Sequence, residues 1–252
     1  MKTGCESRGS LPVQGSVLIY NISLSYSLAM AEVITDSSFN QVTARIIVWL
    51  ERRKFTIGLA LFLTAWYFVQ LFIAHKIGFE AAQKWFYFTP DLGMGWIAAP
   101  FSHDMQDAGH LLGNLASLLL AGFLIEPHLK TRQYVTIFLM TLAFSIIIPV
   151  IGLILFVDGE WLVAGASGGV YGLWVFASIY RSDVVRKWRV WISVDEWGDL
   201  SYWFECVIVL FGLALPIIVP LVDLYSGGSA NSISHISGMV LGGVLGLKLK
   251  KQ

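Results

Sequence analysis

The sequence predicts an all-α, polytopic membrane protein built as a bundle of six transmembrane helices. The first reason is composition, because 56% of the 252 residues are hydrophobic and only 13% are charged, about half the charged fraction of a typical soluble domain. The second reason is that six apolar stretches are each long enough to cross a bilayer. The third is that basic residues concentrate on one side of these stretches.

The six apolar stretches cover residues 55–75, 110–126, 134–156, 162–180, 203–222 and 234–250. A helix needs about 17–25 residues to span the hydrocarbon core, and all six are compatible with that length. Because hydrocarbon offers no hydrogen-bond partners, the backbone of each stretch must satisfy its own polar groups. Each stretch is therefore predicted to be a transmembrane helix.

The basic residues predict the orientation of the bundle. Of the 17 Lys and Arg residues, thirteen fall before the first stretch, between the second and third, between the fourth and fifth, or after the sixth. Positively charged loops stay in the cytoplasm, so both termini are expected there, as an even number of spans also requires. We expect an integral protein of the cell (plasma) membrane.

The segment before the first span is predicted to be a weakly structured cytoplasmic tail over residues 1–44, followed by the membrane domain over 45–252. An alternative is that translation starts at Met30. Val42, Ile46 and Trp49 share one helical face, which predicts a short interfacial helix that lies on the lipid bilayer. The aromatic loop 76–109 is longer than ordinary connectors, and we expect it to lie partly in the outer leaflet.

A few polar residues interrupt the apolar stretches and carry the functional argument. His110 and Asn114 lie on the second stretch, Ser167 on the fourth and His235 on the sixth. These three stretches all start from the outer side, so the four residues are predicted to share one layer near the outer surface. Polar residues inside spans usually face the bundle interior or a water-filled cavity and mark a functional site.

The residue types predict acyl-transfer chemistry. A serine hydroxyl becomes a nucleophile when a neutral histidine takes its proton, so we predict a catalytic pair of Ser167 and His235. His110 and Asn114, one helical turn apart, together with the Ser167 backbone N–H, are expected to form an oxyanion hole. Asp158 and Asp223 are the nearest acids on the outer side and fall in predicted loops. A dyad without a buried carboxylate is therefore expected.

Small and aromatic residues are predicted to bring the serine and the histidine together. Glycines let helices approach closely in lipid, and they recur on the fourth and sixth stretches at Gly165, Gly168, Gly172, Gly238, Gly242 and Gly246. Tyr171, one turn after the serine, is placed to hold the imidazole of His235 by stacking.

Together these motifs resemble the rhomboid family of intramembrane serine proteases. The matching residues are His110-xxx-Asn114, Gly165-Ala166-Ser167-Gly168 and His235-xx-Gly238-xxx-Gly242, with Tyr171 and Glu126 at further family positions. The resemblance implies a six-helix rhomboid-like bundle and a serine endopeptidase that cleaves transmembrane substrates through an acyl-enzyme. It also implies that the fifth span, with Pro216 and Pro220, is a lateral gate and that loop 223–233 is a flexible cap.

Two other functional classes are compatible with intramembrane polar residues. A transporter would need polar groups at the midplane and on the inner half of the bundle, whereas the polar residues here concentrate near the outer surface. An inactive relative that binds membrane helices would usually lack the serine or the histidine, and this chain keeps both. We expect no cofactor, no metal site and no nucleic-acid partner.

Overall fold

The computed structural model describes residues 38–90, 93–156, 162–185, 200–226 and 229–251. The chain divides into two compact units, Met1–Glu51 and Arg52–Gln252. In the first unit, α2 (Ser38–Glu51) confirms the predicted helix, and its residues Val42 and Ile46 expose about half of their surface. The boundary expected at residues 44 and 45 falls within α2, and the tail before residue 38 lies outside the described residues.

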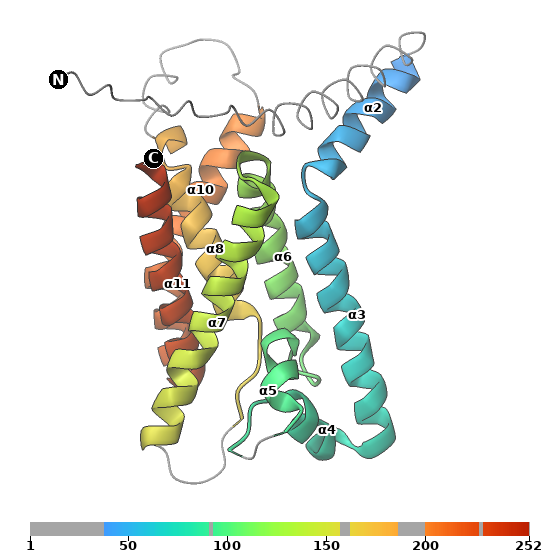
Figure 1. Cartoon of the computed structure of the whole chain (residues 1–252), viewed down its shortest axis with the longest axis vertical. Helices are drawn as coiled ribbons and strands as arrows, with labels where there is room; N and C mark the ends of the chain where they lie inside the picture. Colours follow the sequence, from blue (N-terminus) through green and yellow to red (C-terminus); the bar gives the residue numbers. More distant parts are fainter. Residues whose placement is uncertain (1–37, 91–92, 157–161, 186–199, 227–228, 252) are drawn as a thin grey trace, which may run out of the picture. The chain divides into compact units, whose positions relative to one another are not determined.

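The second unit is a helical bundle (Figure 1). Its elements are α3 (Lys54–Ile77), α4 (Phe79–Phe86), α5 (Gly95–Ala98), η1 (Ala99–Phe101), α6 (Ala108–Ile125), η2 (Glu126–His128), α7 (Thr131–Phe156), α8 (Ser167–Tyr180), α10 (Leu200–Ser226) and α11 (Ser229–Lys250). The described part of the chain contains no β-strand beyond one isolated bridge between Phe88 and Val163. The all-α fold is therefore confirmed, and the loop 76–109 contains α4, α5 and η1.

Five described helices are long and apolar enough to cross a membrane: α3, α6 with η2, α7, α10 and α11. The fourth predicted span differs, because α8 begins only at Ser167 and has 14 residues. At 1.5 Å per residue it is about 21 Å long, shorter than the hydrocarbon core of about 30 Å. The prediction of a helix from residue 162 was wrong.

Protein contacts explain why α8 can be short. All of its residues from Ser167 to Ser178 are buried except the half-buried Tyr171, and it contacts α6, α7, α10 and α11. The extended segment 162–166 enters the bundle and meets α8 within it (Figure 1). Val163 exchanges backbone hydrogen bonds with Phe88, and the N–H of Gly165 donates to the carbonyl of Ala99. Non-helical backbone is tolerated at membrane depth when protein surrounds it.

The glycines form the contact between α8 and α11. A Cβ atom on Gly238 would overlap the carbonyl oxygen of Gly168, and one on Gly242 would overlap the carbonyl oxygen of Gly172. The two helices therefore pack backbone to backbone, as small residues permit in lipid. This close approach sets the distance between side chains carried by α8 and by α11.

Glu126 joins the end of α6 to the start of α3. Its buried carboxylate accepts hydrogen bonds from the backbone N–H groups of Phe55 and Thr56, each at 2.9 Å, and from the Thr56 hydroxyl at 2.6 Å. The first N–H groups of a helix have no partner within the helix, and a negative charge is favourable beside them. Glu126 thus caps α3 and fixes it against α6.

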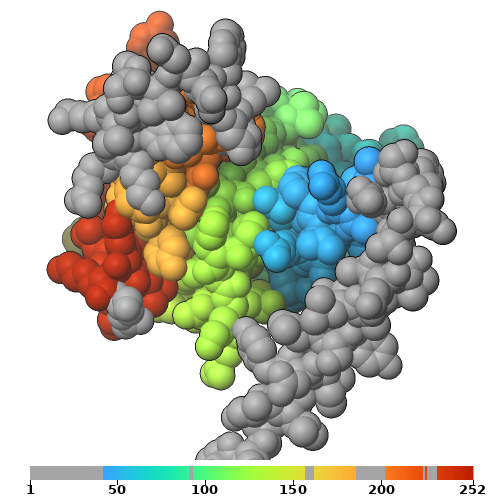
Figure 2. Space-filling view, turned by 90° about the horizontal axis from the view of Figure 1, so that it is seen from above, coloured from blue at the N-terminus to red at the C-terminus, as the bar shows by residue number. Residues whose placement is uncertain are grey.

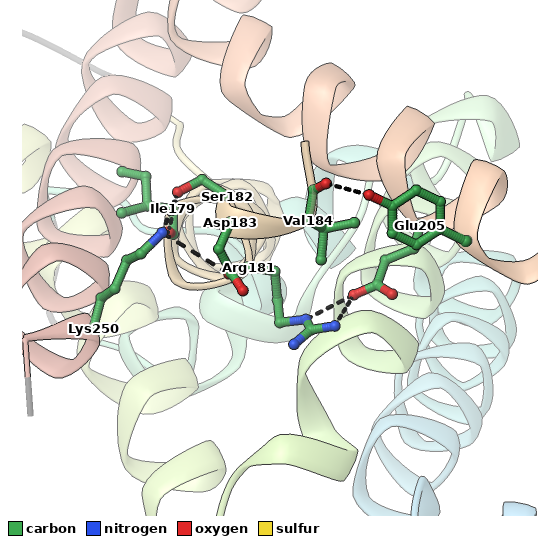
Figure 3. Close-up of polar contacts among 8 residues, drawn as sticks. Ile179, Arg181, Ser182, Asp183, Val184, Glu205 and Lys250 are labelled. Atoms are coloured by element: carbon green, nitrogen blue, oxygen red, sulfur yellow. Dashed lines mark hydrogen bonds and ion pairs between the residues drawn. The ribbon is translucent and has the colours of Figure 1, made fainter. Parts of the chain in front are cut away.

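Polar contacts tie the end of α8 to its two neighbours at the Lys250 end of the bundle, where α8 and α11 end and α10 begins. The Lys250 ammonium donates to the Ser182 hydroxyl at 2.5 Å and lies 4.0 Å from Asp183. Arg181 forms an ion pair with Glu205 of α10 (Figure 3). Figure 2 looks onto this end and shows α11 in red, α8 in gold and α10 in orange side by side.

Candidate active site

Ser167 is the first residue of α8, and its side chain faces α11. The Ser167 Oγ lies 2.8 Å from Nε2 of His235, although 68 residues separate them in sequence, and the serine is only 6% exposed. The backbone turns into α8 at Gly165, whose φ of 129° is unfavourable for residues with a Cβ. The structure thus brings the predicted nucleophile and base into hydrogen-bond contact.

The second ring nitrogen of His235 contacts a carboxylate that the sequence reasoning excluded. His235 Nδ1 lies 2.8 Å from Asp223 Oδ2, and the two side chains are 12% and 14% exposed. The expectation of a pair without a carboxylate was wrong, because α10 extends to Ser226 and α11 begins at Ser229. Asp223 therefore lies in the last turn of α10 and not in a loop. Within the predicted flexible cap 223–233, the described residues 223–226 and 229–233 are helical, and residues 227–228 lie outside the described residues.

The two contacts of His235 fix where its proton lies. An ionised carboxylate can only accept a hydrogen bond, so the Nδ1–H of His235 donates to Asp223. In the neutral ring Nε2 then carries a lone pair and accepts from the Ser167 hydroxyl. This is the tautomer that a general base for serine requires.

Tyr171 packs against the imidazole, but not in the expected way. Its ring centroid lies 5.0 Å from that of His235 with an interplanar angle of 72°, which is an edge-to-face contact and not a stack. Such aromatic pairs are favourable because a positive ring edge meets a negative ring face. The tyrosine therefore limits the rotation of the imidazole from the α8 side.

His110 lies beside Ser167 with a defined tautomer. An ideal Cβ position at Gly165 would be 3.5 Å from both His110 Nε2 and Ser167 Oγ, so these atoms border the same small space. The backbone N–H of Asp104 donates to His110 Nδ1 at 3.3 Å. Because that nitrogen accepts, the neutral ring carries its proton on Nε2, and this donor faces the space beside the serine.

Asn114 follows one turn later on α6. It is 1% exposed, and its Nδ2 group has no hydrogen-bond partner among the residues that the structure describes. It shares a helix face with Leu111 and Leu118, which belong to the same core as Ala166 and Val170 at the start of α8. A buried amide donor without a partner is costly, and such a group deserves a functional explanation.

His103 supports His110 from the loop that precedes α6. Gln70 accepts from the His103 N–H at 3.1 Å, and Tyr87 donates to the His103 carbonyl at 3.1 Å. The imidazole is fully buried and meets His110 edge to face at 5.4 Å. Burial, with a smaller effect of His110, lowers the pKa of His103 from 6.5 to about 4. No motif in the sequence indicated this contact between His103 and His110.

The lowered pKa of His103 predicts loss of stability in acid. Between pH 6.5 and about 4 the unfolded chain binds a proton at this site that the folded chain does not, so stability is complete above pH 6.5 and declines as the pH falls. The thermal unfolding midpoint in detergent should fall from pH 7.5 to pH 5 by more in wild type than in His103→Leu. Equal decreases in both proteins would contradict a buried neutral His103.

The fold and this site define a class, namely polytopic α-helical membrane proteins that hold a serine–histidine pair between two helices. The family model described as Rhomboid domain matches residues 90–252, well over half of the chain. The chain belongs to the rhomboid family, as the sequence motifs predicted, and this is a family of intramembrane serine proteases. A search among curated proteins found no match.

Proposed function

We propose that this protein is an intramembrane serine endopeptidase that cleaves transmembrane helices near the outer leaflet through an acyl-enzyme. The observation that carries the proposal is the 2.8 Å contact between Ser167 Oγ and His235 Nε2 across the α8–α11 packing contact. A serine paired with an imidazole in the correct tautomer is the arrangement that activates a hydroxyl for attack on an amide.

The reaction follows from the geometry in two halves. Ser167 Oγ bonds to the carbonyl carbon of the scissile amide, and its proton passes to His235 Nε2. The C–N bond then breaks as His235 donates that proton to the leaving nitrogen, which leaves an ester on Ser167. A water molecule, deprotonated by His235, attacks the ester and restores the serine, with the same groups acting in reverse order.

Three donors are available for the oxyanion that forms in each half. They are the Nε2–H of His110, the unpartnered Nδ2–H of Asn114 and the backbone N–H of Ser167, which as the first residue of α8 has no partner within the helix. Preorganised donors in a site shielded from water stabilise developing charge strongly. This role accounts for the buried Asn114 amide.

The same proposal assigns the substrate and the orientation. Both termini lie in the cytoplasm of a cell whose plasma membrane holds the protein, because the basic residues gather at that side. The substrate is a single transmembrane helix that enters sideways from the bilayer past α10. Pro216 and Pro220 interrupt α10, and each removes a helix hydrogen bond, which favours movement of this helix.

The test is cleavage of single-span model substrates by the purified chain in liposomes, with the cut mapped by mass spectrometry. A cut near the outer end of the substrate helix, together with labelling of Ser167 by a fluorophosphonate, supports the proposal. A folded chain that neither cleaves any of these substrates nor reacts with the probe would overturn it.

The oxyanion assignment predicts a selective loss of turnover. Replacing Asn114 with alanine should lower kcat by about 10²–10³-fold with a small change in KM, because its donor acts mainly on the transition state. His110→Ala should behave similarly. Ser117→Ala, one turn further along the buried face of α6, is the matched control and should keep wild-type kcat. Wild-type kcat in Asn114→Ala would remove this residue from the oxyanion hole.

A further inference from the structure

The contact between His235 and Asp223 indicates the tautomer of the imidazole, but the proposed mechanism gives the carboxylate itself no role. The carboxylate comes from α10 and the imidazole from α11, and both side chains are mostly buried. Without Asp223, the hydrogen bond to Ser167 and the edge-to-face contact with Tyr171 would leave the imidazole able to adopt the other tautomer. That change would remove the Nε2 lone pair from the serine hydroxyl.

We propose that Asp223 is a positioning residue, which holds His235 in the tautomer and orientation of a general base and favours the imidazolium formed during attack. This inference rests on the proposed function and completes it with a third residue. The charge of the carboxylate matters as well as its hydrogen bond, because an opposite charge about 3 Å away stabilises the protonated ring.

Because Asp223 is carried by α10, the orientation of the general base His235 depends on the position of this helix. The other end of α10 is tied to α8 by the Arg181–Glu205 ion pair and by the Tyr202 hydroxyl, which donates to the Val184 carbonyl at 2.6 Å (Figure 3). Pro216 and Pro220 lie between that tied end and Asp223. Movement of the Asp223 end of α10 away from α11 would therefore break the contact with His235. The site is complete only while α10 lies against α11.

In the part of the chain that the structure describes, four groups contact the imidazole or interact with it electrostatically. They are Asp223 on α10, Ser167 and Tyr171 on α8, and His110 on α6, which interacts electrostatically with His235. Among these groups, Asp223 brings a negative charge into contact with the ring.

The experiment uses the full chain in liposomes with a cleavable single-span substrate. Asp223→Asn should lower kcat by about 10–100-fold with little change in KM, within the range of effects on general acid–base steps. Asp223→Glu should recover part of the activity. The exposed Tyr225→Phe on α10 is the matched control and should keep wild-type kcat.

The outcomes separate this inference from the proposed function. If wild type cleaves and Asp223→Asn keeps wild-type kcat, the positioning role is refuted while the protease stands. A second measurement does not depend on cleavage. In the chain labelled with ¹⁵N-histidine, the Nδ1 of His235, assigned by comparison with His235→Gln, should carry a strongly deshielded proton that disappears in Asp223→Asn. An unprotonated Nδ1 in wild type would also overturn the inference.

Discussion

Replacing Ser167 with alanine is expected to reduce cleavage by at least about 10³-fold, while the thermal unfolding midpoint stays near that of wild type. The Ser167 hydroxyl lies 2.8 Å from His235 Nε2, where it can attack a substrate and transfer its proton to the imidazole. Removing the hydroxyl leaves the hydrogen bond between His235 and Asp223 in place. The packing around His235 should therefore stay the same. Initial rates in liposomes and fluorophosphonate labelling measure the effect.

Additional variants show whether the two residues act as one unit. His235→Ala should cost about as much as Ser167→Ala, and the double variant should cost little more than either, because catalytic groups that share one step are strongly non-additive. Ser178→Ala is the matched control, since this serine is buried on the same helix. A Ser167→Ala protein that keeps more than a tenth of wild-type activity would exclude the serine as nucleophile.

Introducing a methyl group at Gly242 is expected to destabilise the folded protein clearly. A Cβ atom there would overlap the carbonyl oxygen of Gly172, and backbone cannot move aside as a flexible side chain can. Overpacking of this kind costs about 1–3 kcal/mol and occasionally more. Gly242→Ala should therefore lower the unfolding midpoint clearly, and it should also lower activity because α11 carries His235.

Gly58→Ala on α3 provides the matched control, because a Cβ at that position has no atom within 4 Å. Alanine is a better helix former than glycine, so this variant should be as stable as wild type or slightly more stable. If Gly242→Ala unfolded at the same temperature as Gly58→Ala, the backbone contact between α8 and α11 would not exist in the membrane protein.

The long helices could be predicted from sequence because lipid sets their length. A helix that faces hydrocarbon must be apolar over its full span, and α3, α6, α7, α10 and α11 all show this pattern. The serine, the histidine and the small residues were also predictable. Ser167 falls on the fourth apolar stretch, and His235 and Gly238 fall on the sixth, where polar and small residues stand out from the apolar pattern. Their contact confirmed the packing that the glycine pattern indicated.

The length of α8 and the role of Asp223 could not be predicted in the same way. Neighbouring helices shield α8 from lipid, so hydrophobicity over 162–180 reports burial and says nothing of where the helix begins. Asp223 was predicted to be a loop residue because the apolar stretch ends at residue 222, whereas the helix itself continues to Ser226. Asp223 lies three residues before the end of α10 and His235 six residues after the start of α11, so the two residues lie near the adjoining ends of consecutive helices.

By itself, the sequence determined that the chain is an α-helical membrane protein and which serine and histidine are candidates for catalysis. The reason is that these features depend on the solvent and on local spacing. The tertiary structure alone decided where α8 starts inside the bundle, which carboxylate contacts His235 and which tautomer the contacts of His110 and His235 favour. Those properties depend on contacts between helices distant in sequence, which no local pattern encodes.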